Sequence, residues 1–437
     1  MNVLYIHSHD TGRAVQPFGA PVAMPAYQRL AEDGVLFRRA FSAAPTCSPS
    51  RAALLTGQSP HSAGMMGLAH RGFGLHDPRQ HLASVLRANG FRTALFGMQH
   101  VTRDDPAGLG YDVVAAQDDR SAANVAPLAA AFLAERGDDA EGQPFFLDVG
   151  FEECHRPFLP ANPGADRFVA PPAVIPDLPQ TRSDMADFEA SARALDRGVG
   201  IVLEALDAAG LADDTLVICT TDHGLAFPDM KCTLTDLGTG VLLILRGPGA
   251  FAGGRVVDAL AAQIDLFPTL CEALAIAPPT WLQGTSLLPL LRGEAESVHD
   301  AVFGEVTYHA AYDPQRTVRT DRWRYIRRFD GRTKPVLPNV DDSPSKTVLM
   351  DAGWGERAIA PEALYDCLLD PMQRVNVIQR PDLGAVVEEM RGRLDRWMHE
   401  TADPLLSGPV PFPPGGVAND PDGLSPNEVP TVRSASI

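Results

Sequence analysis

The sequence predicts an α/β protein with a large, mostly parallel sheet and helices on both faces, followed by a smaller α+β domain with an antiparallel sheet. Short apolar runs alternate with helical patterns through the first part of the chain, and this alternation stops near residue 300. The length of 437 residues also exceeds what one small core needs. We therefore expect one domain at residues 1–300, a second at 301–407 and a tail at 408–437.

Short apolar runs are the predicted strands of the large sheet. Each is apolar or β-branched and is bounded by Gly, Asp or Pro, as is typical of buried strands. They lie at residues 2–6, 92–96, 145–149, 215–220 and 241–245. Apolar residues recur at three- and four-residue steps over residues 183–209, which predicts a long helix. Parallel strands joined by such helices are the expected arrangement.

The last part of the chain has a different pattern. Residues 302–307 and 322–329 are predicted antiparallel strands, and apolar positions between Leu383 and Trp397 mark one amphipathic helix. The tail from Gly408 is rich in Pro and Gly, so we expect a wrapping arm or a loose end. Such an arm is compatible with exchange between the subunits of a homo-oligomer.

Composition narrows the function classes. The chain carries 37 basic and 55 acidic residues, a net charge of −18, which argues against a general nucleic-acid binder. The N-terminus has no secretory signal and no apolar run is long enough to span a membrane, so a membrane is not an expected partner. The six cysteines lack C-x-x-C spacing and indicate neither a zinc site nor a disulfide framework. We expect a cytoplasmic protein, although a mature secreted form would begin in the same way.

Polar residues come directly after four of the predicted strands. In chain order they are Asp10, His100, His155 and the pair Asp222 and His223. Because open α/β sheets bind ligands beyond the carboxyl ends of their strands, we expect these residues to converge. Two carboxylates with an imidazole suit Ca²⁺, Mg²⁺ or Mn²⁺. The alternatives are that Asp222 lies in a simple turn and His100 in a surface loop. For His9 the sequence leaves three roles open: a metal ligand, a partner of a ligand, or a solvent-facing residue.

Residues 47–57 are predicted to form a loop that enters a short helix. Pro49 suits the first helical turn and Gly57 suits the helix end. Cys47 would then lie at a helix N-terminus, where free N–H groups and the helix dipole favour an anion. The alternative is a small, buried cysteine without a chemical role.

This segment strongly resembles the sulfatase signature, Cys-x-Pro-Ser-Arg followed by a Leu-x-Gly-like pattern, in which the cysteine is oxidised to formylglycine. Residues 221–224, 231–238 and 364–376 resemble the family's second metal motif, the lysine segment after it and the C-terminal domain. The resemblance reaches from the first strand to about Leu406. It implies an alkaline-phosphatase-like fold and a sulfuric ester hydrolase that releases inorganic sulfate from a sulfate ester or sulfamate. It also implies a formylglycine-generating enzyme as maturation partner.

The resemblance implies one divalent metal ion, surrounded by Asp10, Asp222, His223 and the modified Cys47. We expect Ca²⁺, but His9 stands where the family often has a second aspartate, which leaves Mn²⁺ and Mg²⁺ open. Phosphonate and phosphodiester hydrolases of the same superfamily also have a single aspartate with an arginine three residues later. Asp10 and Arg13 have that spacing, so these hydrolases are similar as well.

The resemblance further implies how the remaining residues share the chemistry. Hydrated formylglycine at position 47 has two hydroxyls on one carbon, and one of them attacks sulfur and expels the alcohol. The other hydroxyl then loses its proton towards His100, so that sulfate leaves and the aldehyde returns. Arg51 would hold the formylglycine and help balance the anion. Lys231 and His155 would contact the sulfate and protonate the leaving oxygen.

One basic residue of the family pattern is missing. The family's Gly-Lys-x-His segment has Met98 in place of the lysine. Arg71 and Arg103 are candidates to supply the lost positive charge. His70, Arg71 and His76 lie in a Gly-rich stretch and could line a substrate pocket, but a solvated loop is the preferred interpretation.

The leading hypothesis is a sulfatase acting on a small sulfated sugar, an aryl sulfate or an alkyl sulfate. The first alternative is a phosphonate monoester or phosphodiester hydrolase built on the same site. The second is a non-catalytic binding protein in which Cys47 stays unmodified. A papain-like cysteine hydrolase is disfavoured, because no pattern of imidazole and orienting residue accompanies Cys47.

Overall fold

An eight-stranded sheet forms the centre of the computed structural model, which describes residues 1–115, 118–137, 142–430 and 432–433. β9 (Leu243–Arg246) runs antiparallel to β7 (Thr215–Thr221) and β2 (Val35–Phe37), whereas the other neighbouring strands are parallel. The predicted class, a large and mostly parallel sheet, is therefore confirmed. In spatial order the strands are β10 (Arg255–Val257), β2 (Val35–Phe37), β9 (Leu243–Arg246), β7 (Thr215–Thr221), β1 (Asn2–Ser8), β6 (Phe145–Gly150), β4 (Arg92–Gly97) and β5 (Val113–Ala115).

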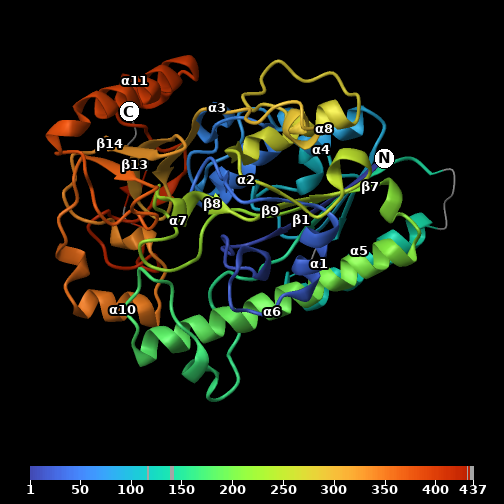
Figure 1. The fold of residues 1–437 in the computed structure, drawn as a ribbon, viewed down its shortest axis with the longest axis horizontal. Coiled ribbons are helices and arrows are strands. Elements are labelled where there is room, and N and C mark those ends of the chain that lie inside the picture. Colours follow the sequence, from blue (N-terminus) through green and yellow to red (C-terminus); the bar gives the residue numbers. More distant parts are fainter. Residues whose placement is uncertain (116–117, 138–141, 431, 434–437) are drawn as a thin grey trace.

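Helices cover both faces of this sheet (Figure 1). One face carries α1 (Pro25–Asp33), α5 (Ala122–Gly137) and α6 (Pro179–Ala208), and the other carries α2 (Cys47–Thr56), α4 (Leu82–Ala88) and α8 (Leu266–Ala273). Side chains alternate across a strand, so β1 contributes to two cores. Leu4 and Ile6 pack in the core that includes α5 and α6, whereas Val3 and Tyr5 pack in the core that includes α2 and α8. A strand that is buried on both faces needs apolar residues at every position, which explains the continuous apolar runs in the sequence.

Four of the predicted strands, and the long helix, are confirmed as β1, β4, β6, β7 and α6. The prediction of one strand at 241–245 is wrong. That segment divides into β8 (Gly240–Val241), which joins a small sheet with β3 (Ala40–Phe41) and β11 (Ala261–Ala262), and β9 of the main sheet. At the break, the backbone N–H of Leu242 donates to the carbonyl of Gly12, 2.9 Å away, so the chain changes hydrogen-bonding partner there.

A separate antiparallel sheet follows in the chain. Its strands, in order, are β12 (Val302–Tyr308), β13 (Tyr312–Arg319), β14 (Trp323–Arg328) and β15 (Glu362–Asp366). Helix α11 (Gly384–Glu400) contacts β13 and β14. The two predicted strands and the amphipathic helix of this region are confirmed as β12, β14 and α11. The exact domain limits at residues 300 and 407 stay a prediction.

The remaining short elements connect these layers. They are α3 (Pro60–Ala63), α7 (Asp236–Thr239), α9 (Leu288–Leu291), α10 (Pro344–Asp351), β16 (Val417–Ala418) and β17 (Val432–Arg433). None of the helices in the described ranges is long and apolar enough to cross a bilayer.

Residues 408–430 of the C-terminal tail pack against the rest of the molecule, so over this range the tail is a wrapping arm, whereas residues 431 and 434–437 lie outside the described residues. The Tyr308 hydroxyl donates to the carbonyl of Val410 at 2.5 Å. The N–H of Asn419 donates to the carbonyl of Ala310 at 2.8 Å. Lys346 Nζ donates to the carbonyl of Leu424 at 2.7 Å.

A buried ionic network ties α3 to the antiparallel sheet. Glu305 accepts hydrogen bonds from both the backbone N–H and Nδ1 of His61, each at 2.6 Å. Arg316 Nε lies 3.1 Å from Glu305 Oε2 and 2.5 Å from Asp403 Oδ2. With His61 protonated, two carboxylates balance two cations, which is the condition under which buried charges are tolerated.

We expect this network to make stability depend on pH. Burial disfavours the charged imidazolium, but the carboxylate of Glu305 outweighs burial and raises the pKa of His61. The stabilisation is therefore complete below the ordinary pKa of about 6.5 and is lost as pH rises through the higher folded-state pKa. Urea unfolding of the wild type and His61→Gln at several pH values checks this. The difference between their free energies of unfolding should shrink as pH rises, and a constant difference would contradict the prediction.

Candidate active site

Four adjacent parallel strands deliver polar residues to one edge of the main sheet. Their order is β7-β1-β6-β4, and the residues that follow them are Asp222, Asp10, His155 and His100. Asp10 and His100 take a positive φ, 50° and 57°, so the chain turns sharply just after each strand. The structure thus brings together the residues that the sequence separates by up to 212 positions. The surface-loop alternative for His100 is wrong, because His100 lines the cavity described below.

Cys47 lies in the first turn of α2, and the whole of this helix is buried. Thr46 is extended before the helix, and Gly57 ends it with a left-handed φ of 67°. The Ser50 hydroxyl donates to the carbonyl of Asp222 at 2.5 Å, which fixes the helix against β7. Cys47 Sγ lies 3.4 Å from Nε2 of His223. The thiol therefore faces the ends of the strands.

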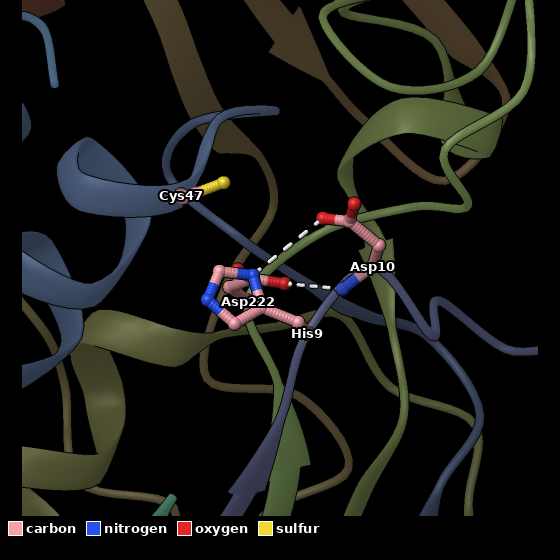
Figure 2. A group of neighbouring side chains, drawn as sticks. All are labelled: His9, Asp10, Cys47 and Asp222. Atoms are coloured by element: carbon pink, nitrogen blue, oxygen red, sulfur yellow. Dashed lines mark hydrogen bonds and ion pairs between the residues drawn. The ribbon is translucent and has the colours of Figure 1, made fainter. Parts of the chain in front are cut away.

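Figure 2 shows a compact group of potential metal ligands, His9, Asp10, Cys47 and Asp222. Their ligand atoms all lie within 4.8 Å of one another. The backbone N–H of Asp10 donates to Asp222 Oδ1 at 2.9 Å and holds the two aspartates together. His9 Nδ1 lies 3.0 Å from Asp222 Oδ2 and 3.7 Å from Asp10 Oδ1. His9 is fully buried, so its solvent-facing interpretation is wrong.

The donor set fits a divalent cation. Both ring nitrogens of His9 and Oδ1 of Asp10 are buried and make no hydrogen bond within the described part of the chain. Buried polar atoms without hydrogen bonds are costly, and a cation placed among these residues would bind Oδ1 of Asp10 and one ring nitrogen of His9. His223 Nδ1 lies 2.9 Å from the carbonyl of Gly224, which leaves Nε2 as the free nitrogen facing Asp10 Oδ1 at 3.2 Å. The simple-turn interpretation of Asp222 is therefore wrong, because its carboxylate is part of this cluster.

Two cations lie against the same carboxylates. Arg51 Nη2 donates to Asp222 Oδ2 at 3.1 Å and to the carbonyl of Ser8 at 2.9 Å. Lys231 Nζ donates to Asp10 Oδ2 at 2.9 Å. Burial opposes ionisation of the Cys47 thiol, but Lys231 and His223 outweigh burial and hold its pKa well below the usual range. The position of Cys47 therefore favours negative charge.

Imidazoles surround the opening above Cys47. His100 and His155 were expected there, and His309, in the turn between β12 and β13, joins them. His309 is buried, and its Nδ1 has no hydrogen-bond partner among the described residues. No motif marked His309 in the sequence, although a polar residue just after the predicted strand at 302–307 was a usable signal.

A cavity of about 620 Å³ opens over Cys47. His70 and Arg71 both line this cavity, so the pocket-lining alternative holds for them, although His70 is exposed as expected for a solvated loop. His76 and Arg103 are exposed and are not among its lining residues, so Arg103 is not a replacement for the missing lysine. The other charged residues that line it include Arg156, Asp184, Lys231, Asp341 and Asp342.

Known protein families match the chain over most of its length. A family model described as Sulfatase matches residues 1–276, and one described as N-sulphoglucosamine sulphohydrolase, C-terminal, matches residues 231–348. The chain is similar to N-sulphoglucosamine sulphohydrolase of Homo sapiens, at 30% identity over 93% of this chain and 92% of that protein. It is also similar to a Delta 4,5-hexuronate-2-O-sulfatase of Bacteroides thetaiotaomicron, at 24% identity over 91% of this chain and 89% of that protein.

Solved structures share the fold. One is a protein in complex with its substrate, D-glucosamine-2-N,6-O-disulfate, with a TM-score of 0.72 and 16% identity over 93% of this chain and 98% of that chain. Another is described as a 2-O GAG sulfatase, with a TM-score of 0.72 and 22% identity over 100% of this chain and 98% of that chain.

Proposed function

Because this chain belongs to the sulfatase family and is a sulfuric ester hydrolase, we propose that it acts on a small sulfated sugar with a formylglycine made from Cys47. The observation that carries the proposal is the place of Cys47. It begins a buried helix, lies within a cluster of metal-type ligands and faces a cavity of about 620 Å³. A monosaccharide or short oligosaccharide suits a cavity of this size. The relative from Homo sapiens is named for N-sulphoglucosamine, so we choose that sugar as the first substrate to test.

A divalent cation would be held by His9, Asp10, Asp222 and His223, together with the side chain at position 47. Once bound, it would supply positive charge that offsets the charge of the sulfate group and favours an ionised nucleophile. Ca²⁺ is the ion we expect, although His9 takes one carboxylate out of the usual oxygen set and so narrows the preference for Ca²⁺ over Mn²⁺. Formylglycine that has added one water would supply two hydroxyls on one carbon, one for attack on sulfur and one whose deprotonation releases sulfate.

The other residues bind the anion and move protons. Lys231 lines the cavity and would hold the negatively charged sulfate oxygens, whereas Arg51, which is buried and donates to Asp222, would hold the formylglycine and help balance the anion. His100 would accept the proton of the second hydroxyl. His155 and His309 both line the cavity, so either imidazole is placed to donate a proton to the leaving oxygen of the sugar. In the overall reaction water is consumed, and the sugar leaves with a hydroxyl or amine in place of its sulfate.

Removal of the metal should abolish activity reversibly. Without a divalent cation, Asp10 and Asp222 are balanced only by Lys231, Arg51 and His9, which leaves less positive charge to offset the sulfate at position 47. We expect dialysis against a chelator to reduce sulfate release by at least about 100-fold. Ca²⁺, Mn²⁺ and Mg²⁺ are then added back singly and binding is followed by calorimetry. Full activity in metal-free protein that binds none of these ions would contradict the prediction.

The phosphonate hydrolase alternative loses one of its arguments. Arg13, the arginine three residues after Asp10, donates from Nη2 to the carbonyl of Ala40 at 2.7 Å and lies over the ring of Phe41. It is not among the residues that line the cavity. The spacing shared with phosphonate hydrolases therefore places no cation near the substrate here.

Sulfate release from glucosamine 2-N-sulfate tests the proposed function. Ion chromatography of inorganic sulfate is compared with hydrolysis of 4-nitrophenyl sulfate and of an aryl phosphonate monoester by the same preparation. We expect the two sulfated compounds to be hydrolysed faster than the phosphonate. A clear preference for the phosphonate would instead support the first alternative. If protein with modified Cys47 turned over none of these compounds, the proposed function would be contradicted.

A further inference from the structure

The cavity over Cys47 contains one strongly basic side chain that lacks a carboxylate partner among the described residues. Arg156 pairs with both oxygens of Asp184, at 2.7 and 2.9 Å. Lys231 lies 2.9 Å from Asp10 and 3.0 Å from Asp341. Arg71 lines the same cavity but forms no ion pair in the described part of the chain.

Arg71 is instead held by neutral oxygens. Its Nη1 donates to the carbonyl of Ala310 at 3.2 Å and to Oδ1 of Asn419 at 2.8 Å. Its Nε is buried and has no hydrogen-bond partner within the described ranges. The side chain is half-buried, and burial lowers its pKa, yet a guanidinium stays charged at neutral pH. A half-buried positive charge with unused donors costs free energy until an anion binds it.

The C-terminal arm, residues 408–430, fixes the position of this guanidinium. The amide nitrogen of Asn419 donates to the carbonyls of Ser425, Pro426 and Glu428, at 3.3, 3.4 and 2.9 Å. These contacts settle the orientation of the amide, so its oxygen faces Arg71. Pro426 and Asn427 of the same arm line the cavity. The arm thus forms part of the cavity wall and holds the guanidinium of Arg71 in place.

We propose that Arg71 binds a second anionic group of the substrate, a carboxylate or a second sulfate on the same sugar, while the reacting sulfate lies at Cys47. The proposal rests on the function proposed above and narrows it to doubly charged sugars. A planar guanidinium suits both anions, because each presents two oxygens to its fork. The missing partner of Arg71 is then supplied by the substrate.

Ligand pairs that differ by one charge test this selectivity. Binding to the Cys47→Ala protein is measured by calorimetry with glucosamine 2-N-sulfate against glucosamine 2-N,6-O-disulfate, and with a 2-O-sulfated hexose against the corresponding 2-O-sulfated uronate. We expect the doubly charged member of at least one pair to bind roughly 10- to 100-fold more tightly. The pair that shows the preference identifies the second group as sulfate or carboxylate.

Arg71→Ala, made in the Cys47→Ala protein, should erase that preference and leave the affinity for singly charged ligands within about threefold of its former value. Asn419→Asp is a second variant, since it places a carboxylate on Arg71 and should erase the preference equally. Because it also removes the hydrogen bonds that Asn419 donates to the carbonyls of the arm, its free energy of unfolding is measured alongside. Arg396→Ala removes an exposed arginine of α11 and should change nothing.

Three results would overturn the proposal: no preference in either pair, no binding of any of the four ligands, or an equal loss for both members of a pair on Arg71→Ala. The last would assign Arg71 to the reacting sulfate, in place of the lysine that Met98 replaces. The proposed function fails separately, through absence of sulfate release by modified wild-type protein, and the binding measurements do not depend on turnover.

Discussion

Replacement of Cys47 with alanine is expected to reduce kcat by at least about 10⁴-fold, the largest loss of any single substitution in this chain. The methyl group leaves no atom that can attack sulfur, whereas Lys231 and the ligand cluster still bind the sulfate. KM should therefore change much less than kcat. Initial rates of sulfate release from glucosamine 2-N-sulfate measure the effect.

The covalent state of Cys47 provides the independent check. Modification to formylglycine should lower the mass of the tryptic peptide 40–51 by about 18 Da and make it reactive towards hydrazides. Cys271→Ala is the matched control, because Cys271 is a buried cysteine in α8, away from the cavity, and its loss should leave kcat unchanged. An active wild-type protein with an unmodified thiol would refute formylglycine and favour a thiol mechanism.

The central strands were predictable because burial on both faces gives continuous apolar runs. β1, β4, β6 and β7 are such runs, and they are the strands that carry the site. Strands of two or three residues, such as β2 and β11, are too short for periodicity to appear. Their partners are set by tertiary packing, which is also why β8 and β9 belong to different sheets.

β13 was missed for a different reason. The strand contains Asp313, Pro314, Gln315 and Arg316, a composition that argues against a buried strand. Arg316 is nevertheless fully buried, because Glu305 and Asp403 neutralise it. Glu305 lies opposite Arg316 on the neighbouring strand β12 and Asp403 comes from a distant segment, so the pattern within β13 alone cannot reveal that the charge is compensated.

The residues of the candidate site also fall into two groups, those that local sequence predicts and those that tertiary packing places. The strand pattern predicts where the residues after the central strands lie, and the signature predicts the place of Cys47. His309 and Asp341 come from the region of the antiparallel sheet, and Asn419 comes from the arm. His309 and Asp341 line the cavity, and Asn419 holds Arg71 at its wall, only because these segments pack over the strand ends. Recognition of the reacting sulfate is thus encoded locally, whereas the walls that select a substrate depend on long-range packing.

Asp222→Asn should cause the second largest loss, at least about 10³-fold in kcat/KM. The carboxylate of Asp222 joins the components of the site, since Oδ1 accepts the backbone N–H groups of Asp10 and His223, and Oδ2 faces Arg51 and His9. An asparagine oxygen could still accept the two backbone donors. Its NH₂ group would then point at the guanidinium of Arg51, donor against donor, and one metal-binding charge would be lost.

Calorimetric titration with Mn²⁺ and Ca²⁺ separates the two causes, and we expect Asp222→Asn to bind either ion at least about 100-fold more weakly than the wild type. Asp341→Asn is the matched control, because Asp341 contacts Lys231 at 3.0 Å but is not part of the ligand cluster. It should keep normal metal affinity and lose no more than about tenfold in kcat/KM. If Asp222→Asn kept both metal affinity and activity, the cluster around Cys47 would not be the metal site, and the assignment of Asp10 and His223 as ligands would fall with it.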